Sequence, residues 1–272
     1  MFKKIFAGIL LFGWAAGVQA KPQPAKADLL LRLNRHVYCL YREGLRNLKC
    51  DLTFGYWEDL KSVARQKFGP NDSKTKGLDQ VKFTLTYLPP GVWKFSVTPY
   101  HPVGDKKFDA KALGLIHGFQ NLIRIFTLTW GGMISNPLYN PENIEKHHCT
   151  VETMDDGFKV SERWKDPKGK PIRFTLQFNK DEKCLRGDFA FGTYGFTLKP
   201  VWEDQPHGMV LKSFEVDVPT EKRREYFDVE YQTPDGFRLP ESFSYREKRF
   251  DLKPSGKNAS MEVIFSNYRV NE

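Results

Sequence analysis

Apolar and polar positions recur with two different periods along this chain of 272 residues. Between residues 30 and 63 the apolar side chains lie three and four positions apart, which is the spacing of an amphipathic helix. We therefore predict one long helix there, or two in succession with an interruption at Gly44 or Gly55, and an end at Gly69. The apolar positions are Leu30, Leu33, Val37, Tyr41, Leu45, Leu48, Leu52, Tyr56, Leu60 and Val63.

The next segment alternates with period two on both sides of a Pro-Pro-Gly turn at residues 89–91. Residues 81–87 and 92–97 therefore form a predicted β-hairpin. A second helix pattern follows over residues 109–130 and is apolar over more than half of its circumference. Such a helix has to be covered on two sides or to face a cavity.

Beyond Pro141 the chain becomes a series of short alternating runs separated by Gly, Pro, Asp and Asn. Strands at this spacing without intervening helices predict an antiparallel meander with one apolar and one polar face. A sheet of so many strands has to twist and curl, which gives it a concave face. We predict an α+β fold, mainly antiparallel β, in which a curled, unclosed β half-barrel has helices packed across its concave face. The runs cover residues 158–164, 172–178, 189–191, 196–202, 210–218, 227–231, 243–245 and 261–265.

The N-terminus has the pattern of a cleavable export signal. Lys3 and Lys4 precede an apolar run from Ile5 to Gly17, and residues 18–20 put small side chains where signal peptidase cuts. The run is too short to span a ~30 Å hydrocarbon core as a helix. We expect residues 1–20 to be a signal peptide and residues 21–272 to be a single domain, soluble after cleavage and periplasmic or secreted.

The chain carries a formal net charge of +9, which becomes 9 − 2 = +7 without Lys3 and Lys4. Basic residues are interspersed with acidic ones, as in residues 221–225, which is typical of a solvated surface. Attraction to anionic lipid headgroups is the alternative. Because no arginine-rich block or RNA-binding motif is present, and exported proteins rarely meet nucleic acid, we predict no nucleic-acid partner.

Four cysteines, Cys39, Cys50, Cys149 and Cys184, are an even set in an oxidising compartment. They allow two disulfides in any of three connectivities, with reduced, buried thiols as the alternative. On one continuous helix Cys39 and Cys50 would lie ~16 Å apart, which is too far for a bond. Either the helix breaks near Gly44 or each cysteine pairs elsewhere.

The sequence has little recognisable catalytic chemistry. His147, His148 and Cys149 are good zinc ligands, but neighbours on a strand point to opposite faces, so we predict no metal site there. His36, His101, His117 and His207 are isolated. No common hydrolase, protease or phosphate-loop motif is present, so we predict neither a cofactor nor enzymatic activity. A hydrolase with dispersed catalytic residues stays an alternative.

Two stretches near the C-terminus carry a family resemblance. Residues 227–240, with an Asp-Gly turn before Leu239 and Pro240, and the ending 265–271 resemble the periplasmic lipoprotein carriers (LolA/LolB-like) of the outer-membrane lipoprotein-sorting superfamily. The hairpin from Lys168 to Leu185 is similar to the middle of their sheet. The resemblance implies an unclosed β-barrel that shelters acyl chains from water without a chemical reaction.

We therefore expect an exported, non-enzymatic carrier or binding protein for a lipid or an acylated, lipoprotein-like ligand, held between the concave sheet face and the lid helices. Its partners would be that lipid or acylated protein, together with membrane-associated loading and receiving proteins. An exported structural or protein-interaction module with a packed core is the alternative. The candidate groove residues are Ile116, Phe119, Ile123, Phe126, Trp130, Phe83, Leu85, Trp93, Phe95, Phe174, Leu176, Phe189 and Phe191.

Overall fold

The computed structural model describes residues 28–33, 37–88, 92–134, 148–165, 169–192, 194–250 and 260–272. The expected signal peptide, residues 1–20, lies outside the described residues. The chain divides into two compact units. The first unit consists of Met1–Cys39, Met133–Phe227 and Glu247–Asn258, and the second of Leu40–Gly132, Asp228–Arg246 and Ala259–Glu272.

Both units consist mainly of antiparallel strands with a few helices, which confirms the predicted α+β class and its antiparallel strands. A single-residue parallel bridge joins Val37 to Met209 within the first unit. The finer expectation of a curled half-barrel with helices across its concave face stays a prediction. Among the described helices, none has both the length and the apolar character that crossing a bilayer requires.

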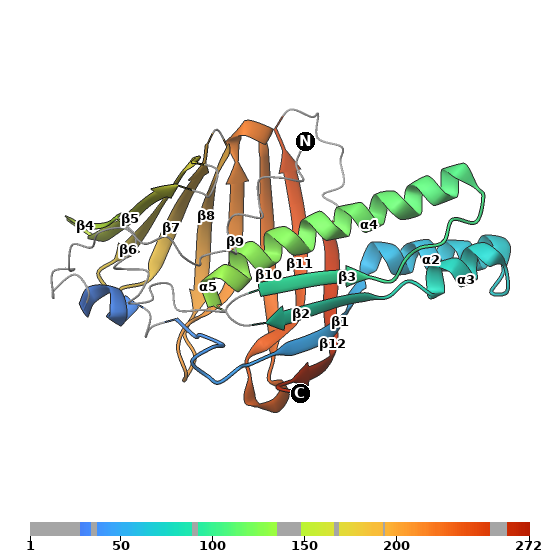
Figure 1. Cartoon of the computed structure of the whole chain (residues 1–272), viewed down its shortest axis with the longest axis horizontal. Helices are drawn as coiled ribbons and strands as arrows, with labels where there is room; N and C mark the ends of the chain where they lie inside the picture. Colours follow the sequence, from blue (N-terminus) through green and yellow to red (C-terminus); the bar gives the residue numbers. More distant parts are fainter. Residues whose placement is uncertain are drawn as a thin grey trace. The chain divides into compact units, whose positions relative to one another are not determined.

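The first unit is a meander in which each strand pairs with the next one along the chain (Figure 1). The predicted runs between residues 158 and 218 match its strands. The first strand is not among the predicted alternating runs, because its polar sequence offers few large apolar side chains, although Cys149 was expected to lie on a strand. The strands are β4 (His148–Met154), β5 (Gly157–Lys165), β6 (Pro171–Asn179), β7 (Cys184–Phe191), β8 (Tyr194–Glu203), β9 (Val210–Val218) and the start of β10 (Arg223–Gln232), with the 3-10 turn η4 (Pro219–Glu221) between β9 and β10.

Short-range chemistry fixes the turns of this meander. At the start of β5 a β-carbon on Gly157 would collide with the carbonyl oxygen of Phe178 on β6, so only glycine fits. Between β6 and β7 the Asn179 side chain accepts a hydrogen bond from the backbone N–H of Lys183 at 2.9 Å. Glu182 takes the left-handed conformation there, with φ of 62°. These contacts set the register that aligns the apolar side chains of β6 and β7.

The second unit has the strand order β3-β2-β1-β12-β11-β10. The predicted hairpin and the predicted helix 109–130 are confirmed, the helix starting slightly earlier, after Asp105, which caps the N–H of Phe108 at 3.1 Å. The elements are β1 (Leu48–Phe54), α2 (Gly55–Phe68), α3 (Ser73–Asp79), β2 (Phe83–Leu88), β3 (Val92–Val97), α4 (Lys106–Phe126), the π-helical turn η3 (Thr127–Gly131), the start of α5 (Gly132–Ile134), the end of β10, the 3-10 turn η5 (Pro234–Gly236), β11 (Leu239–Arg249) and β12 (Ser260–Val270).

The prediction of one helix, or two in succession, over residues 30–63 is wrong in its middle. Residues 28–33 are helical and α2 begins at Gly55, but residues 48–54 form β1. Leu48, Cys50, Leu52 and Phe54 also alternate with period two, and all four are buried. Because β1 pairs with β2 on one side and with β12 on the other, the strand satisfies its backbone hydrogen bonds in the sheet instead of a helix.

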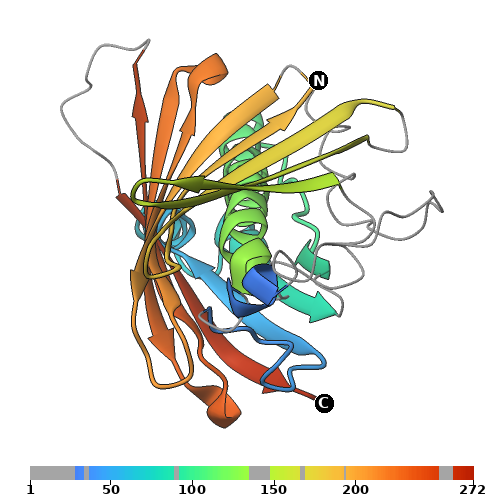
Figure 2. The same ribbon diagram turned by 90° about the vertical axis from the view of Figure 1, so that its left-hand side faces the viewer.

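Aromatic rings fill the core of the second unit between α4 and its strands. Phe119 of α4 stacks on Phe54 of β1, with ring centroids 4.0 Å apart. Two turns further along α4, Phe126 stacks on Phe243 of β11, with ring centroids 4.2 Å apart. Figure 2 shows α4 running beside the strands of this unit. The apolar excess that the sequence shows on this helix is therefore used for packing.

Candidate functional site

The candidate site is a row of three phenylalanine side chains on the apolar face of the first unit. Phe174, Phe189 and Phe196 lie directly opposite one another on β6, β7 and β8. Their ring centroids are 6.0 Å and 4.7 Å apart, and their planes differ by 12° and 14°. We call these three residues the phenylalanine row. All three side chains keep part of their surface exposed.

The row lies within an apolar face that is buried in part. Along β6, Phe174 sits between Ile172 and Leu176 on the same face, and these neighbours are only 5% and 2% exposed. Along β8, Leu198 is buried while Phe196 is partly open. Because exposed and buried apolar side chains share one face, the row belongs to the accessible part of a larger apolar surface.

Gly187 shapes the surface beside the row. This residue lies on β7 opposite Leu176 and Leu198, so both neighbouring strands carry a leucine where β7 has no side chain. A β-carbon there would lie 2.8 Å from Cε2 of Phe189 and 3.0 Å from Cδ2 of Leu176. The Phe189 ring therefore lies over the bare backbone of Gly187, which is the close approach that a glycine in a strand allows.

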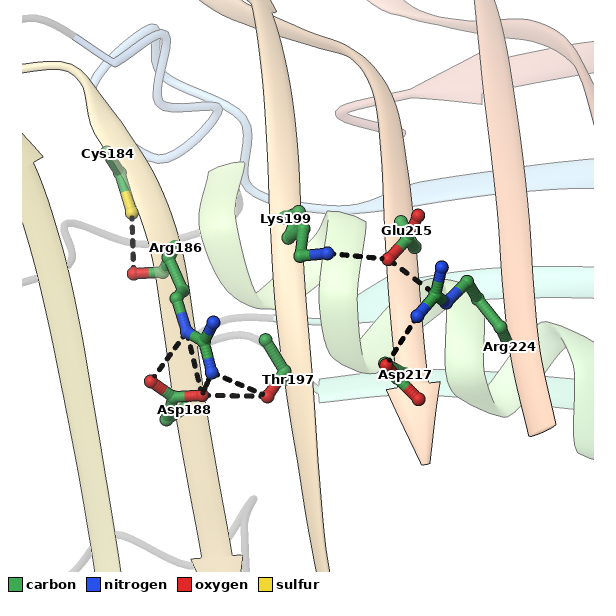
Figure 3. A network of polar contacts seen from close by, with 8 residues as sticks. All are labelled: Cys184, Arg186, Asp188, Thr197, Lys199, Glu215, Asp217 and Arg224. Atoms are coloured by element: carbon green, nitrogen blue, oxygen red, sulfur yellow. Dashed lines mark hydrogen bonds and ion pairs between the residues drawn. The ribbon is translucent and has the colours of Figure 1, made fainter. Parts of the chain in front are cut away.

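The opposite face of the same strands is polar (Figure 3). Arg186 and Asp188 pair on β7, and Thr197 on β8 donates to Asp188 at 2.7 Å. A second cluster joins β8, β9 and β10: Glu215 contacts Lys199 at 3.0 Å and Arg224 at 3.2 Å, and Arg224 also contacts Asp217 at 2.9 Å. The strands are thus amphipathic, as the alternation predicts.

In the cluster on β7 and β8, hydrogen bonds favour the ionised forms of the charged side chains. Burial opposes ionisation of Asp188, yet the hydrogen bonds from Arg186 and Thr197 keep its pKa below the usual value. The hydrogen bond to Asp188 raises the pKa of Arg186 in turn. Since every member is a charged or hydroxyl group already bonded to a neighbour across the strands, this face fits a solvated, structural role.

The candidate residues of the second unit lie mostly inside its packed core. Phe126 is fully buried between Phe243 and Trp130, and the indole N–H of Trp130 donates to the Tyr231 hydroxyl at 2.9 Å. Phe83 contacts both Phe119 and Phe95. Of this group only Trp93 and Phe95 are partly exposed, and the buried members are Phe83, Leu85, Ile116, Phe119, Ile123, Phe126 and Trp130.

The candidate residues thus divide between the two units. Phe174, Leu176, Phe189 and Phe191 share one face of the first unit. The helix and hairpin residues belong to the second unit. Phe196 completes the phenylalanine row but was not among the predicted site residues. The alternation from Phe196 through Leu198 to Trp202 carried the signal, since it places Phe196 on the apolar face.

None of the four cysteines forms a disulfide: Cys39, Cys50, Cys149 and Cys184 are free and buried. The structure therefore has neither of the two disulfides that the sequence allowed, and it has the alternative of reduced, buried thiols. Neither Cys39 nor Cys50 lies on a helix, and β5 and β6 separate the strands that carry Cys149 and Cys184. Burial raises the pKa of Cys50 and of Cys184 to about 12, so both stay thiols at neutral pH.

The described residues contain no group of three or more His, Cys, Asp or Glu side chains that could hold a metal ion. His101, His117 and His207 are exposed. Among the three adjacent zinc-ligand types at residues 147–149, His147 lies outside the described residues and Cys149 is buried on β4.

Comparison with known proteins gives no relative. No protein-family model matches the chain, and neither a curated protein nor a solved structure matches it.

Proposed function

We propose that this chain is an exported, non-enzymatic carrier of a lipid or an acylated ligand, and that the acyl chain lies on the phenylalanine row of the first unit. The observation that carries the proposal is the partial exposure of the adjacent rings of Phe174, Phe189 and Phe196 on an apolar face whose neighbouring residues Ile172, Leu176 and Leu198 are buried. Export rests on the signal-like pattern of residues 1–20, and kinship with the periplasmic lipoprotein carriers is part of the same proposal.

The chemistry of the row favours an alkyl chain over a peptide. A peptide would bring backbone N–H and C=O groups that need hydrogen-bond partners, and three phenyl rings offer none. An alkyl chain needs only apolar contact. The row crosses three strands and is therefore ~10 Å wide. Each methylene removed from water on it contributes about 0.8 kcal/mol, so several methylenes offset the cost of ordering the chain.

The helix 109–130 is not part of this proposed site. Its apolar side chains Phe119 and Phe126 already stack on Phe54 and Phe243 in the core of the second unit. The packed-core alternative that the sequence left open therefore describes this helix best. The ligand is proposed only for the part of the apolar surface that is exposed.

Binding of a fluorescent fatty acid to the purified protein tests the proposal. Phe196→Ser should weaken uptake about tenfold, since it removes one partly exposed ring from the row. Val201→Ser is the matched control: Val201 lies on the same strand, is 53% exposed and projects from the polar face. It should leave uptake unchanged.

Circular dichroism of both variants should match that of the unaltered protein, because neither side chain is fully buried. The proposal is wrong if the unaltered protein takes up no fatty acid, or if Phe196→Ser and Val201→Ser bind it equally well. Lipid analysis of protein purified from its own compartment then identifies the ligand.

A further inference from the structure

An exposed aromatic residue lies at the end of the first unit where β9 turns into β10. Phe250 directly follows β11, and its backbone N–H donates to the carbonyl oxygen of Lys222 at 2.8 Å. Lys222 ends the turn η4 in the left-handed conformation, with φ of 49°. The Phe250 side chain is 51% exposed, although it is among the most apolar side chains of the chain.

Two cations lie over the Phe250 ring. The guanidinium carbon of Arg224 is 5.4 Å and the ammonium of Lys248 is 5.5 Å from the ring centroid. Both distances are within the range of a cation–π interaction. Ion pairs with Glu215 and Asp217 fix the position of Arg224. The guanidinium group in turn holds the Phe250 ring in place at the surface.

The exposed charges at this end are mainly positive. Lys222, Lys248 and Arg249 are exposed and basic, and Glu247 is exposed and acidic. The other acidic side chains of the turn face Arg223: Glu221 contacts it at 3.0 Å and Glu225 at 3.4 Å. Among the described residues of the β9–β10 turn and the end of β11 in the first unit, three exposed cations therefore stand against one exposed anion.

We propose that this surface, formed by Phe250, Lys222 and Lys248, docks the protein on an anionic lipid bilayer. Aromatic rings settle at the boundary between headgroups and acyl chains, and lysine ammonium groups pair with anionic headgroups around them. A bilayer is the occupant that offers an apolar layer for the ring directly beneath a negative surface for the lysines. The inference does not depend on the phenylalanine row, which lies elsewhere on the first unit.

Vesicle flotation tests this docking surface. The protein should float with vesicles of phosphatidylcholine and phosphatidylglycerol, and much less with phosphatidylcholine alone or at high salt. Each lysine near an anionic surface strengthens binding about fivefold, so Lys222→Glu with Lys248→Glu should reduce binding by well over tenfold. Phe250→Ser should reduce it about tenfold.

Two matched controls distinguish docking by this surface from a general effect of net charge or of exposed apolar side chains. Lys180→Glu with Lys212→Glu makes the same change in net charge at two exposed lysines of the first unit, near the end of β6 and the start of β9 and thus at the other end of the strands. Val201→Ser removes an equally exposed apolar side chain. Both controls should bind vesicles like the unaltered protein.

The proposal is overturned if the unaltered protein does not float with anionic vesicles, if it binds phosphatidylcholine equally well, or if the controls lose as much binding as the Phe250 and lysine variants. The Phe196→Ser variant should still bind anionic vesicles. A protein that docks but takes up no fatty acid would refute the proposed function and leave the docking surface intact.

Discussion

The ring of Phe189 lies over Gly187, two residues earlier on the same strand, so closely that a β-carbon on the glycine would be 2.8 Å from Cε2 of the ring. The Phe189 ring can therefore take this position only because Gly187 has no side chain. The ring is the central member of the phenylalanine row, and what holds it in place also determines the surface that a ligand would meet.

Gly187→Ala should therefore destabilise the protein, because the Phe189 ring or Leu176 has to move. Overpacking of this kind costs about 1–3 kcal/mol. Urea unfolding measures the change. Gly118→Ala on α4 is the control: apart from the neighbouring residues and backbone of the helix itself, no atom lies within 4 Å of its added β-carbon. Alanine is also the better helix former, so stability should be unchanged or higher. Equal stabilities for the two variants would contradict the close approach.

Phe126→Ala should cost far more than Phe189→Ala. Phe126 has 0% exposed surface and stacks on Phe243 and Trp130, so its removal leaves a cavity in the second unit. Removing a buried Phe typically costs about 3–5 kcal/mol. Thermal unfolding of the two variants measures the difference. If Phe126→Ala folded as stably as the unaltered protein, Phe126 would line a cavity, and α4 would return as a candidate for the ligand site.

Asp109 should make the second unit sensitive to acid. Its carboxylate accepts hydrogen bonds from the Tyr100 hydroxyl at 2.7 Å and from the backbone N–H groups of Val103 and Gly104, each at 3.1 Å. These bonds, that of Tyr100 above all, lower the pKa of Asp109 despite the opposing effect of burial.

A carboxyl group whose pKa is lower in the folded than in the unfolded state stabilises the fold above the unfolded value, about 3.9 for Asp. That stability is lost as the pH falls through the folded value. Asp109→Asn should thus lower the melting temperature at pH 7 and bring it closer to that of the unaltered protein near pH 3. Asp59→Asn, at an exposed position of α2, should change neither. A constant difference between Asp109→Asn and the unaltered protein over this pH range would refute the prediction.

The four cysteines should react slowly with a thiol reagent in the native state. All four are buried, and burial raises the pKa of Cys50 and of Cys184 to about 12, so little thiolate is present at pH 8. After unfolding in guanidinium chloride all four should react at once. Fewer than four reactive thiols in the unfolded protein would reveal a disulfide and contradict this structure.

The pattern along the chain predicted the elements whose partners lie close by in sequence. The hairpin of β2 and β3, the helix α4 and the meander from β5 to β9 were all recognisable, because each of these strands pairs with its sequence neighbour and the alternation shows which face is buried. The same alternation placed Phe174, Leu176, Phe189 and Phe191 on one apolar face.

Long-range pairing and packing decided the rest. Residues 48–54 satisfy a helical and a strand period at once, and β1 became a strand because it pairs with β12, about two hundred residues further along the chain. Likewise, the apolar excess of α4 does not reveal whether it lines a cavity or a core. The rings of Phe54 and Phe243, brought to it by distant strands, cover that face. A local period specifies which side of an element is apolar, whereas its partner depends on the free energy of the whole fold.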